Sequence, residues 1–361
     1  MSAMSENRVG AAHMQGAFIL PYGGVWPSFA GPAAYIGAGA AVLGRVRIGR
    51  DAWLGDLAVL RGDGDYVQVG DDCHVGARAT LHIVHESLPC IVGDRVSIGD
   101  NACVHACTVG SDVVIGDNVV VLDGSVVEDN VIIEKDALVF PGKHIAGGHA
   151  YAGAPAKPVR ALEPGEVAAR SAQVRHARAS SVGASRISAA VSARSDIHSS
   201  VFIAATARLR GAIRLAEGAS VFFSNELDAG DALISIGPRT NVQDNTIIRC
   251  STAQGVAIGH GSTVGHNVLI EDSVIGNHSL IGIGSAVAVG TVVEDYVLLA
   301  AGARTAPGQL LETGWLYAGT PARKLAQLDT AKRAMIGFIV ESYCGYSQAF
   351  KTAQDEQQNA G

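Results

Sequence analysis

Residues 236–250 read IGPRTNVQDNTIIRC, and residues 255–270 read GVAIGHGSTVGHNVLI. An aliphatic side chain returns at about every sixth position of both, at Ile236, Val242, Ile248, Ile258, Val264 and Ile270. This period is neither the 3.6 residues of a helical turn nor the simple alternation of a flat sheet. It predicts a coil with three strand-length sides, each turning at a small residue or at Gly, Asn or Asp. Each coil then takes about 18 residues and rises by about 4.8 Å, so that equivalent aliphatic side chains stack inside.

The same rhythm occurs twice in the chain. It runs from Ile36 to Ile133 and again from Leu209 to Leu299. A break, a loop and a one-residue slip interrupt both runs in the same order, at an offset of 166 or 167 residues. Both runs are followed by similar segments, YAGAPAKPVRAL and YAGTPARKLAQL. The chain is therefore predicted to be an all-β tandem duplication of one β-helix domain, in which no coil buries its core alone.

The pattern also predicts domain boundaries. We expect an N-terminal segment at 1–24, a first β-helix domain at 25–162, a linker at 163–181 and a second domain at 182–361. The second domain is expected to end in a helix over 325–352, which packs along a side or covers an open end of the coil. The apolar face of that helix is predicted to hold Leu325, Leu328, Met335, Ile336, Ile339, Val340 and Tyr343.

Composition limits the classes of partner. The formal net charge is −7 and no run rich in Lys and Arg occurs, so a nucleic-acid-binding surface is not expected. No stretch reaches the roughly 18 apolar residues of a membrane helix. The six cysteines form no CxxC pair, which favours reduced thiols in a cytosol. We expect a cytoplasmic protein that binds neither nucleic acid nor membrane.

Several short motifs carry a family resemblance. They are RGD at 61–63, LHI at 81–83, VHACTVG at 104–110, NVQDN at 241–245, GHN at 265–267 and the closing YAGxPA of each half. Together they resemble the gamma-class carbonic anhydrase family, over about 25–162 and 207–351. The resemblance implies a left-handed parallel β-helix. It also implies a divalent metal between two subunits of a trimer, held by two His of one subunit and one His of the next, with an Arg–Asp pair, an Asn, a Gln and an Asp around it.

The first half carries one part of that set. It keeps the Arg–Asp pair as Arg61 and Asp63, and two metal ligands as His82 and His105. The places of the Asn, Gln, Asp and third His are taken by His74, Gly76, Ala77 and Asp100.

The second half carries the complementary part. It keeps Asn241, Gln243, Asp244 and His266. The places of the Arg, Asp and two remaining His are taken by Asp228, Gly230, Arg249 and Glu271. A spacing of 23 residues separates His82 from His105 and also Gln243 from His266, which puts each pair on one side of its own coil.

The resemblance then implies a shared metal site. His82, His105 and His266 would hold the metal and leave one position open for water, the arrangement of catalytic Zn²⁺, with Fe²⁺ or Co²⁺ also suited to imidazole. The substrate would be CO₂ or bicarbonate, in a homo-oligomer with trimeric β-helix packing. In an alternative, Asp100 replaces the third His and first halves alone build a site.

Other residues have implied roles around this site. Gln243 would orient the bound hydroxide or bicarbonate, with Asn241 beside it, and Arg61 would pair with Asp244. His85 and Glu86, just after His82, are candidates for proton transfer to solvent.

The assembly and the activity leave alternatives open. A closed ring of three cannot alternate two kinds of domain, so a mixed ring needs two of one half and one of the other; otherwise each half forms its own ring. Rival functions are a hexapeptide acyltransferase with His266 as general base, a metal-dependent CoA thioesterase, and an inactive structural subunit of a larger assembly. Bound metal separates the structural subunit from the metalloenzyme.

Overall fold

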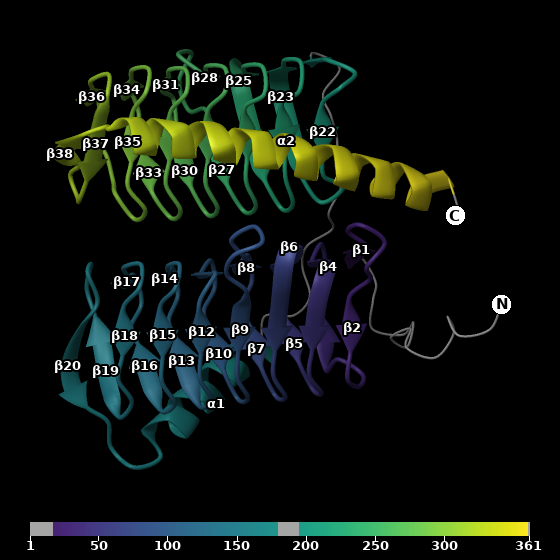
Figure 1. Cartoon of the computed structure of the whole chain (residues 1–361), viewed down its shortest axis with the longest axis vertical. Coiled ribbons are helices and arrows are strands. Elements are labelled where there is room, and N and C mark those ends of the chain that lie inside the picture. Colours follow the sequence, from purple (N-terminus) through teal and green to yellow (C-terminus); the bar gives the residue numbers. More distant parts are fainter. Residues whose placement is uncertain (1–16, 180–194, 360–361) are drawn as a thin grey trace. The chain divides into compact units, whose positions relative to one another are not determined.

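The computed structural model describes residues 17–179 and 195–359. The chain divides into two compact units, 1–187 and 188–361, and each is a parallel β-helix (Figure 1). The all-β, hexapeptide-type architecture predicted from the six-residue period is therefore confirmed. Most of the N-terminal segment 1–24, and the junction of the predicted linker with the second domain, lie outside the described residues.

The first unit has three faces, made from two sheets. Strands of its 12-stranded sheet are β1 (Phe18–Leu20), β2 (Ser28–Phe29), β4 (Ala41–Ile48), β6 (Val59–Val69), β8 (Thr80–His82), β9 (Cys90–Val92), β11 (Cys103–His105), β12 (Thr108–Val109), β14 (Val120–Val121), β15 (Val126–Val127), β17 (Leu138–Val139) and β18 (His144–Ile145). Its 8-stranded sheet holds β3 (Tyr35–Ile36), β5 (Trp53–Leu54), β7 (His74–Val75), β10 (Ser97–Ile98), β13 (Val113–Ile115), β16 (Val131–Ile133), β19 (His149–Ala152) and β20 (Lys157–Ala161). The long strand β6 pairs with both β8 and β9 and so joins two faces into one sheet.

The second unit repeats this plan. Its 10-stranded sheet holds β21 (Asp196–Ile197), β23 (Arg208–Leu215), β25 (Glu226–Ile236), β27 (Ile247–Arg249), β28 (Val256–Ile258), β30 (Leu269–Glu271), β31 (Val274–Ile275), β33 (Ala286–Val287), β34 (Val292–Val293) and β36 (Leu310–Leu311). Its 8-stranded sheet holds β22 (Phe202–Ile203), β24 (Ser220–Val221), β26 (Asn241–Val242), β29 (Thr263–Val264), β32 (Leu280–Ile281), β35 (Leu298–Leu299), β37 (Trp315–Ala318) and β38 (Arg323–Gln327). Here β25 takes the place of β6, pairing with both β27 and β28.

The periodic aliphatic side chains form the core of each unit. Those predicted to point inward are all buried, from Ile36 to Ile133 and from Leu209 to Leu299. They also stack in register: Val75 pairs with Ile98, and Val242 with Val264, one coil apart. The six-residue spacing is interrupted after Leu60 because the long strand β6 continues from one face of the coil to the next.

The corners of the first unit are held by side chains of the following coil. The backbone N–H of Arg50 donates to Asp71 Oδ1 at 2.7 Å, and the N–H of Asp71 donates to Asp94 Oδ1 at 2.8 Å. The N–H of Asp94 then donates to Ser111 Oγ at 3.0 Å, and that of Ser111 to Asp129 Oδ1 at 2.7 Å. Each corner of this column is therefore satisfied by a residue one coil later, which is why Asp and Ser recur there.

Both coils end in the same way. The last strand of each unit reverses direction, so that β20 runs antiparallel to β19, and β38 runs antiparallel to β37. These strands correspond to the two YAGxPA segments, and they end the parallel ladder.

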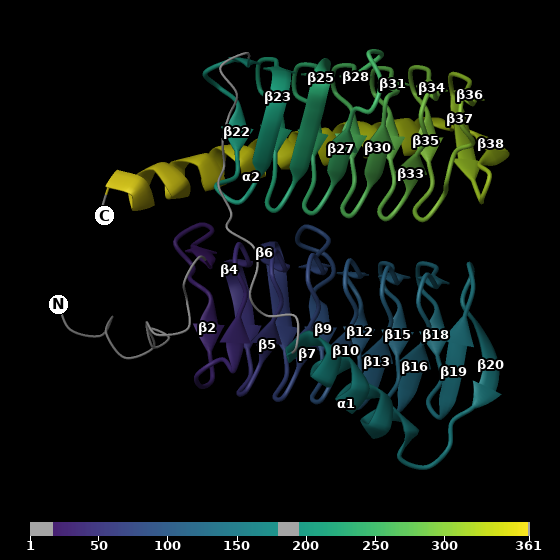
Figure 2. The ribbon, with the colours of Figure 1, turned by 180° about the vertical axis from the view of Figure 1, so that it is seen from behind.

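One helix lies on each unit. α1 (Glu166–Ala179) crosses β10 and β13 of the first unit (Figure 2). Its Val167 packs on Val114 and Ile132, and Ser171 Oγ lies 2.6 Å from Ser97 Oγ.

α2 (Thr330–Asn359) runs along the 8-stranded sheet of the second unit, shown in yellow in Figure 1. Its Phe350 is buried against Phe202 and Phe223. Near its end, Gln354 accepts a hydrogen bond from the N–H of Ala205 at 2.8 Å and donates to the carbonyl of Ile203. The helix therefore both packs along a side and satisfies backbone groups of the first coil.

The bounds of this helix differ from 325–352. Leu325 lies on β38 and is exposed, because the closing strand continues through Gln327 before the helix begins at Thr330. Met335 lies on the helix but is also exposed, so the buried face is narrower than the sequence pattern indicated. Neither helix within the described ranges is long and apolar enough to cross a bilayer.

Candidate metal centre

The RGD motif lies inside β6 of the first unit. Arg61 and Asp63 are both fully buried, and Arg61 Nη1 forms an ion pair with Asp63 Oδ2. A Cβ on Gly62 would lie 2.6 Å from the carbonyl oxygen of Arg45, and one on Gly64 would lie 2.1 Å from His85 Nδ1. The glycines on either side of Asp63 therefore allow two segments to approach this buried pair closely. One is β4, which carries Arg45, and the other is the loop after β8, which carries His85.

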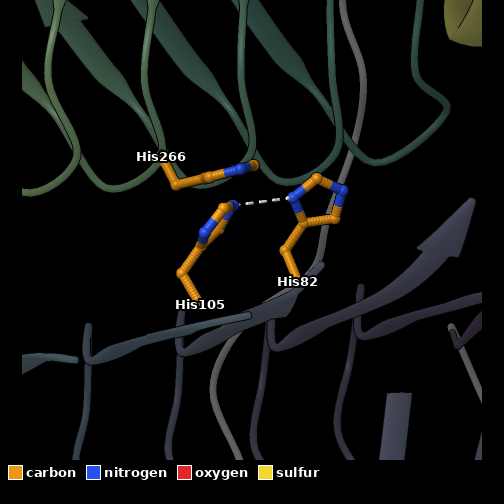
Figure 3. Close-up of side chains that lie close together, drawn as sticks. All are labelled: His82, His105 and His266. Atoms are coloured by element: carbon orange, nitrogen blue, oxygen red, sulfur yellow. Dashed lines mark hydrogen bonds between the residues drawn. The ribbon is translucent and has the colours of Figure 1, made fainter. Parts of the chain in front are cut away.

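The two histidines of the first unit face each other from neighbouring strands. His82 ends β8, His105 ends β11, and the two residues are direct register partners. His82 Nδ1 lies 3.2 Å from His105 Nε2, and the ring centroids are 5.2 Å apart (Figure 3). A tetrahedral Zn²⁺ with its usual Zn–N distances sets two ligand nitrogens roughly 3.3 Å apart, so this spacing suits one shared ion.

A carboxylate holds the outer nitrogen of each ring. Asp63 Oδ1 lies 3.0 Å from His82 Nε2, and Asp123 Oδ1 lies 2.6 Å from His105 Nδ1. When each outer nitrogen donates its proton to a carboxylate, the two inner nitrogens both present lone pairs. Two lone pairs at this separation can share one cation, and carboxylate–imidazole–metal chains are the usual form of such sites. The residues present therefore fit a divalent metal.

The retained residues of the second unit also form one cluster. Asn241 Nδ2 donates to Thr263 Oγ1 at 2.9 Å, and Gln243 Nε2 donates to Asn241 Oδ1 at 3.3 Å. Asp244 Oδ1 accepts from the N–H of Phe223 at 3.0 Å. Its Oδ2 lies 3.2 Å from His266 Nδ1, and both side chains are fully buried.

α2 contributes a further contact to this cluster. Tyr343 Oη lies 3.4 Å from His266 Nε2, and the Tyr343 ring packs edge-on against Phe222 at 5.0 Å between centroids. Within the second unit, both nitrogens of His266 therefore have a neighbour: Asp244 at Nδ1 and Tyr343 at Nε2.

We call two groups by fixed names below. The first wall consists of Arg61, Asp63, His82, His105 and Asp123, and the second wall consists of Asn241, Gln243, Asp244 and His266. The structure brings the members of each wall together within their own unit.

At positions where the residue differs from the one that the resemblance implies, the side chains make structural contacts. In the second unit, Arg249 forms hydrogen bonds of 2.9 and 2.7 Å to Glu271 Oε1, and Asp228 pairs with Arg210 at 3.4 Å. This exposed ion-pair ladder occupies the face where the first unit carries His82 and His105.

The substituted positions of the first unit are also structural. His74 stacks on Trp53, with ring centroids 5.5 Å apart. Asp100 Oδ1 accepts a hydrogen bond from the N–H of Ala77 at 2.9 Å, the same corner role that Asp71 and Asp94 have. That role gives Asp100 a reason to be present other than metal binding.

The predicted proton-transfer pair lies in the loop after β8. His85 Nε2 is 3.9 Å from Glu86 Oε1, and Glu86 is largely exposed. Nearby, burial raises the pKa of Tyr22, and the Asp63 carboxylate raises that pKa further. Tyr22 therefore lies in the field of the first wall.

Three of these residues were not predicted from the sequence as neighbours of the site: Asp123, Tyr343 and Tyr22. Asp123 follows His105 by 18 residues, one full coil, and this spacing is a signal that could have found it. Tyr343 is separated from His266 by 77 residues, and only the packing of α2 brings them together.

Cys103 and Cys107 are buried beside the first wall. A hydrogen bond with Cys90 and then burial raise the pKa of the Cys107 thiol well above its ordinary value. The burial of Cys103 and Cys107 indicates a packing role for both cysteines.

Known proteins are similar to parts of this chain. A family model described as the hexapeptide repeat of succinyl-transferase matches residues 274–303. The chain is 34% identical to protein YrdA of Escherichia coli (strain K12) over 156 residues, which is 42% of this chain and 84% of that protein. It is 37% identical to the mitochondrial gamma carbonic anhydrase 1 of Arabidopsis thaliana over 140 residues, 37% of this chain and 51% of that protein.

A solved structure gives a broader likeness in fold alone. It is described as a putative acetyltransferase from Desulfovibrio desulfuricans G20, with a TM-score of 0.51 and 14% identity, and the match covers 87% of this chain and 77% of that chain.

Proposed function

Because the chain belongs to the gamma-class carbonic anhydrase family of hexapeptide-repeat proteins, we propose that it is a metalloenzyme that hydrates CO₂ to bicarbonate. The observation that carries the proposal is the facing pair His82 and His105. Their inner nitrogens lie 3.2 Å apart, while Asp63 and Asp123 take their outer nitrogens.

His82 and His105 would hold the ion, and His266 would be the third ligand. Zn²⁺ fits this donor set best, although Fe²⁺ and Co²⁺ also accept imidazole. When bound, such an ion supplies a water whose pKa is lowered to near 7, which makes a nucleophile at neutral pH.

The protein's own groups would prepare the site. Asp63 and Asp123 fix the ring tautomers and orientations of the first wall, and Arg61 balances the buried charge of Asp63. Gln243 donates to Asn241, which leaves the Gln243 carbonyl oxygen as the acceptor that orients the attacking water. His85 and Glu86, in the exposed loop after β8, would pass the released proton to solvent.

The two walls are complementary, and this supports a site built from both. The first wall has two histidines and lacks the third; the second wall has the third histidine with the Asn, Gln and Asp that accompany it. We propose that a first wall and a second wall, from one chain or from two, together complete the site in a homo-oligomer with trimeric β-helix packing. His266 would exchange its contact with Tyr343 for the ion.

The test measures metal before activity. Full-length protein is purified without chelator, and metal content and the absorption of a Co²⁺-loaded sample are compared for wild type, His82→Ala and His266→Ala. His144→Ala is the matched control, because His144 is an exposed histidine of the first unit that pairs with Glu128.

We expect metal in the wild type and control, its loss in both site variants, and CO₂ hydration by stopped flow that follows metal content. Metal that survives His266→Ala but not His82→Ala would assign the site to the first unit, with Asp100 as third ligand. Wild-type protein that binds no metal would withdraw the metalloenzyme proposal and leave the structural subunit and acyl transfer as candidates.

A second candidate is acyl transfer, favoured by the hexapeptide match at residues 274–303. His266 would then serve as general base toward an acyl-CoA acceptor. Turnover of acetyl-CoA by metal-free protein, lost in His266→Ala and kept in His82→Ala, would favour this candidate over CO₂ hydration.

A further inference from the structure

A pocket lies within the second unit, beside α2. Its volume is about 390 Å³, within the range of pockets that take small organic ligands. Three corner residues of the coil line one side, Arg239, His260 and His278. Gly337, Val340 and Glu341 of α2 line the other. None of these residues belongs to either wall of the metal centre.

The coil side of the pocket carries a column of rings one coil apart. The rings of His260 and His278 meet edge-on with centroids 4.4 Å apart, and His278 stacks on Tyr296 at 4.9 Å. Burial and the neighbouring His260 lower the pKa of His278, which favours its neutral imidazole. A neutral imidazole offers ring surface and one N–H donor.

The helix side has an unexplained glycine. Gly337 lies inside α2, where glycine weakens a helix relative to alanine because of its backbone freedom. A Cβ at Gly337 would meet nothing within 4 Å, so packing inside the unit does not require this glycine. Its absent side chain instead leaves the pocket open on the helix side.

The rim of the pocket carries a positively charged side chain, Arg239, in an exposed ion pair. Arg239 Nη2 forms an ion pair with Glu341 Oε1, and both side chains are more than half exposed. Exposed pairs contribute little, so a competing carboxylate replaces Glu341 at small cost. A guanidinium binds a carboxylate through two parallel hydrogen bonds, which gives that ligand an advantage over neutral molecules.

From these observations we propose that the pocket between α2 and the His260–His278 corner binds a small planar aromatic carboxylate. The carboxylate pairs with Arg239, and the ring packs between the imidazoles and the open backbone of Gly337. A cationic ligand would be repelled by Arg239 and would have to displace it from Glu341, which also lines the pocket. A bare inorganic anion is far smaller than the pocket and would leave its apolar part unfilled.

The experiment uses full-length protein and isothermal titration calorimetry with benzoate, benzamide and cyclohexanecarboxylate. Benzoate should bind, benzamide at least about tenfold more weakly because it cannot form the charged pair with Arg239. Cyclohexanecarboxylate should bind more weakly than benzoate because it loses the ring contacts.

Variants then locate the binding. Arg239→Gln and Gly337→Leu should each weaken benzoate at least about tenfold. Gly345→Leu is the matched control, since Gly345 lies on the same helix, also has nothing within 4 Å of its Cβ position, and does not line the pocket. Circular dichroism of each variant separates a lost site from a lost fold.

The proposal is overturned if benzoate fails to bind at millimolar concentration, if benzamide binds as well as benzoate, or if Gly337→Leu binds like Gly345→Leu. His82→Ala should keep full benzoate affinity, so the test stands whether or not the metal proposal does.

Discussion

Asp123 lies one coil beyond His105 and holds its Nδ1 at 2.6 Å. The contact decides which nitrogen of His105 faces His82, since a ring that donates at Nδ1 keeps its lone pair at Nε2. Asp123 is half-exposed, so its purpose is not to fill the core. In the proposed metal site it would position His105 as a ligand.

Asp123→Asn should therefore lower metal affinity by about 10- to 100-fold while the fold persists. Competition with a chromophoric chelator measures this. Asp129→Asn is the control, because Asp129 is an exposed corner carboxylate that bonds the N–H of Ser111. An equal loss of affinity in both variants would show that the effect is general electrostatics and not the orientation of His105.

Tyr343→Phe tests the contact between α2 and His266. Removing the hydroxyl releases Nε2 from a hydrogen bond that metal binding must break, so metal affinity should rise by about two- to tenfold. Chelator competition again gives the affinity. Tyr346→Phe, a neighbour whose ring packs edge-on against Tyr343, should leave affinity unchanged.

Gly99→Ala should destabilise the first unit. A Cβ there would lie 2.3 Å from the backbone carbon of Gly116 in the next coil, so the coils must separate, at a cost of about 1–3 kcal/mol. Gly345→Ala should instead stabilise α2 by about 0.5–1 kcal/mol, because that Cβ meets nothing. Urea denaturation measures both, and the two changes should have opposite signs.

Asp272→Asn tests the pH dependence of the second unit. Burial alone would raise the pKa of Asp272, but hydrogen bonds from Ser251 and Thr252 outweigh it and hold the pKa below its usual value. A depressed folded-state pKa stabilises the protein above the unfolded pKa of about 3.9, and the contribution disappears as pH falls through the lower folded value.

The substitution should therefore reduce unfolding free energy at pH 7 and pH 5, and the gap to wild type should shrink toward pH 2.5. Urea titrations at the three pH values measure the gap. A gap that is constant across them would mean that the carboxylate charge is not the stabilising feature.

The fold could be predicted because its rule is local and repeated. A six-residue period places the inward aliphatic side chains between Val42 and Ile133 without knowledge of any distant contact, and all of these periodic side chains are buried. The start of the C-terminal helix was harder to predict. Leu325 fits the apolar face of a helix, but the closing strand β38 takes it, because backbone pairing with β37 outweighs a weak helical pattern.

The site could be predicted where one coil is the unit of spacing. His82 and His105 are register partners, as their positions after equivalent strands imply. Tyr343 could not be found in this way, since its approach to His266 depends on how a whole helix packs on a sheet. The ion-pair ladder of Arg249 and Glu271 also shows that a lost ligand position can acquire a structural role of its own.

The corner hydrogen bonds constrain how the first unit folds while it is being synthesised. Arg50 donates to Asp71, Asp71 to Asp94 and Asp94 to Ser111, so each corner N–H waits for an acceptor that the ribosome has not yet made. A nascent coil of the first unit is complete only when the following coil has emerged. During synthesis, these corner bonds can therefore form no earlier than about one coil behind translation, until β20 turns back on β19 and ends the ladder.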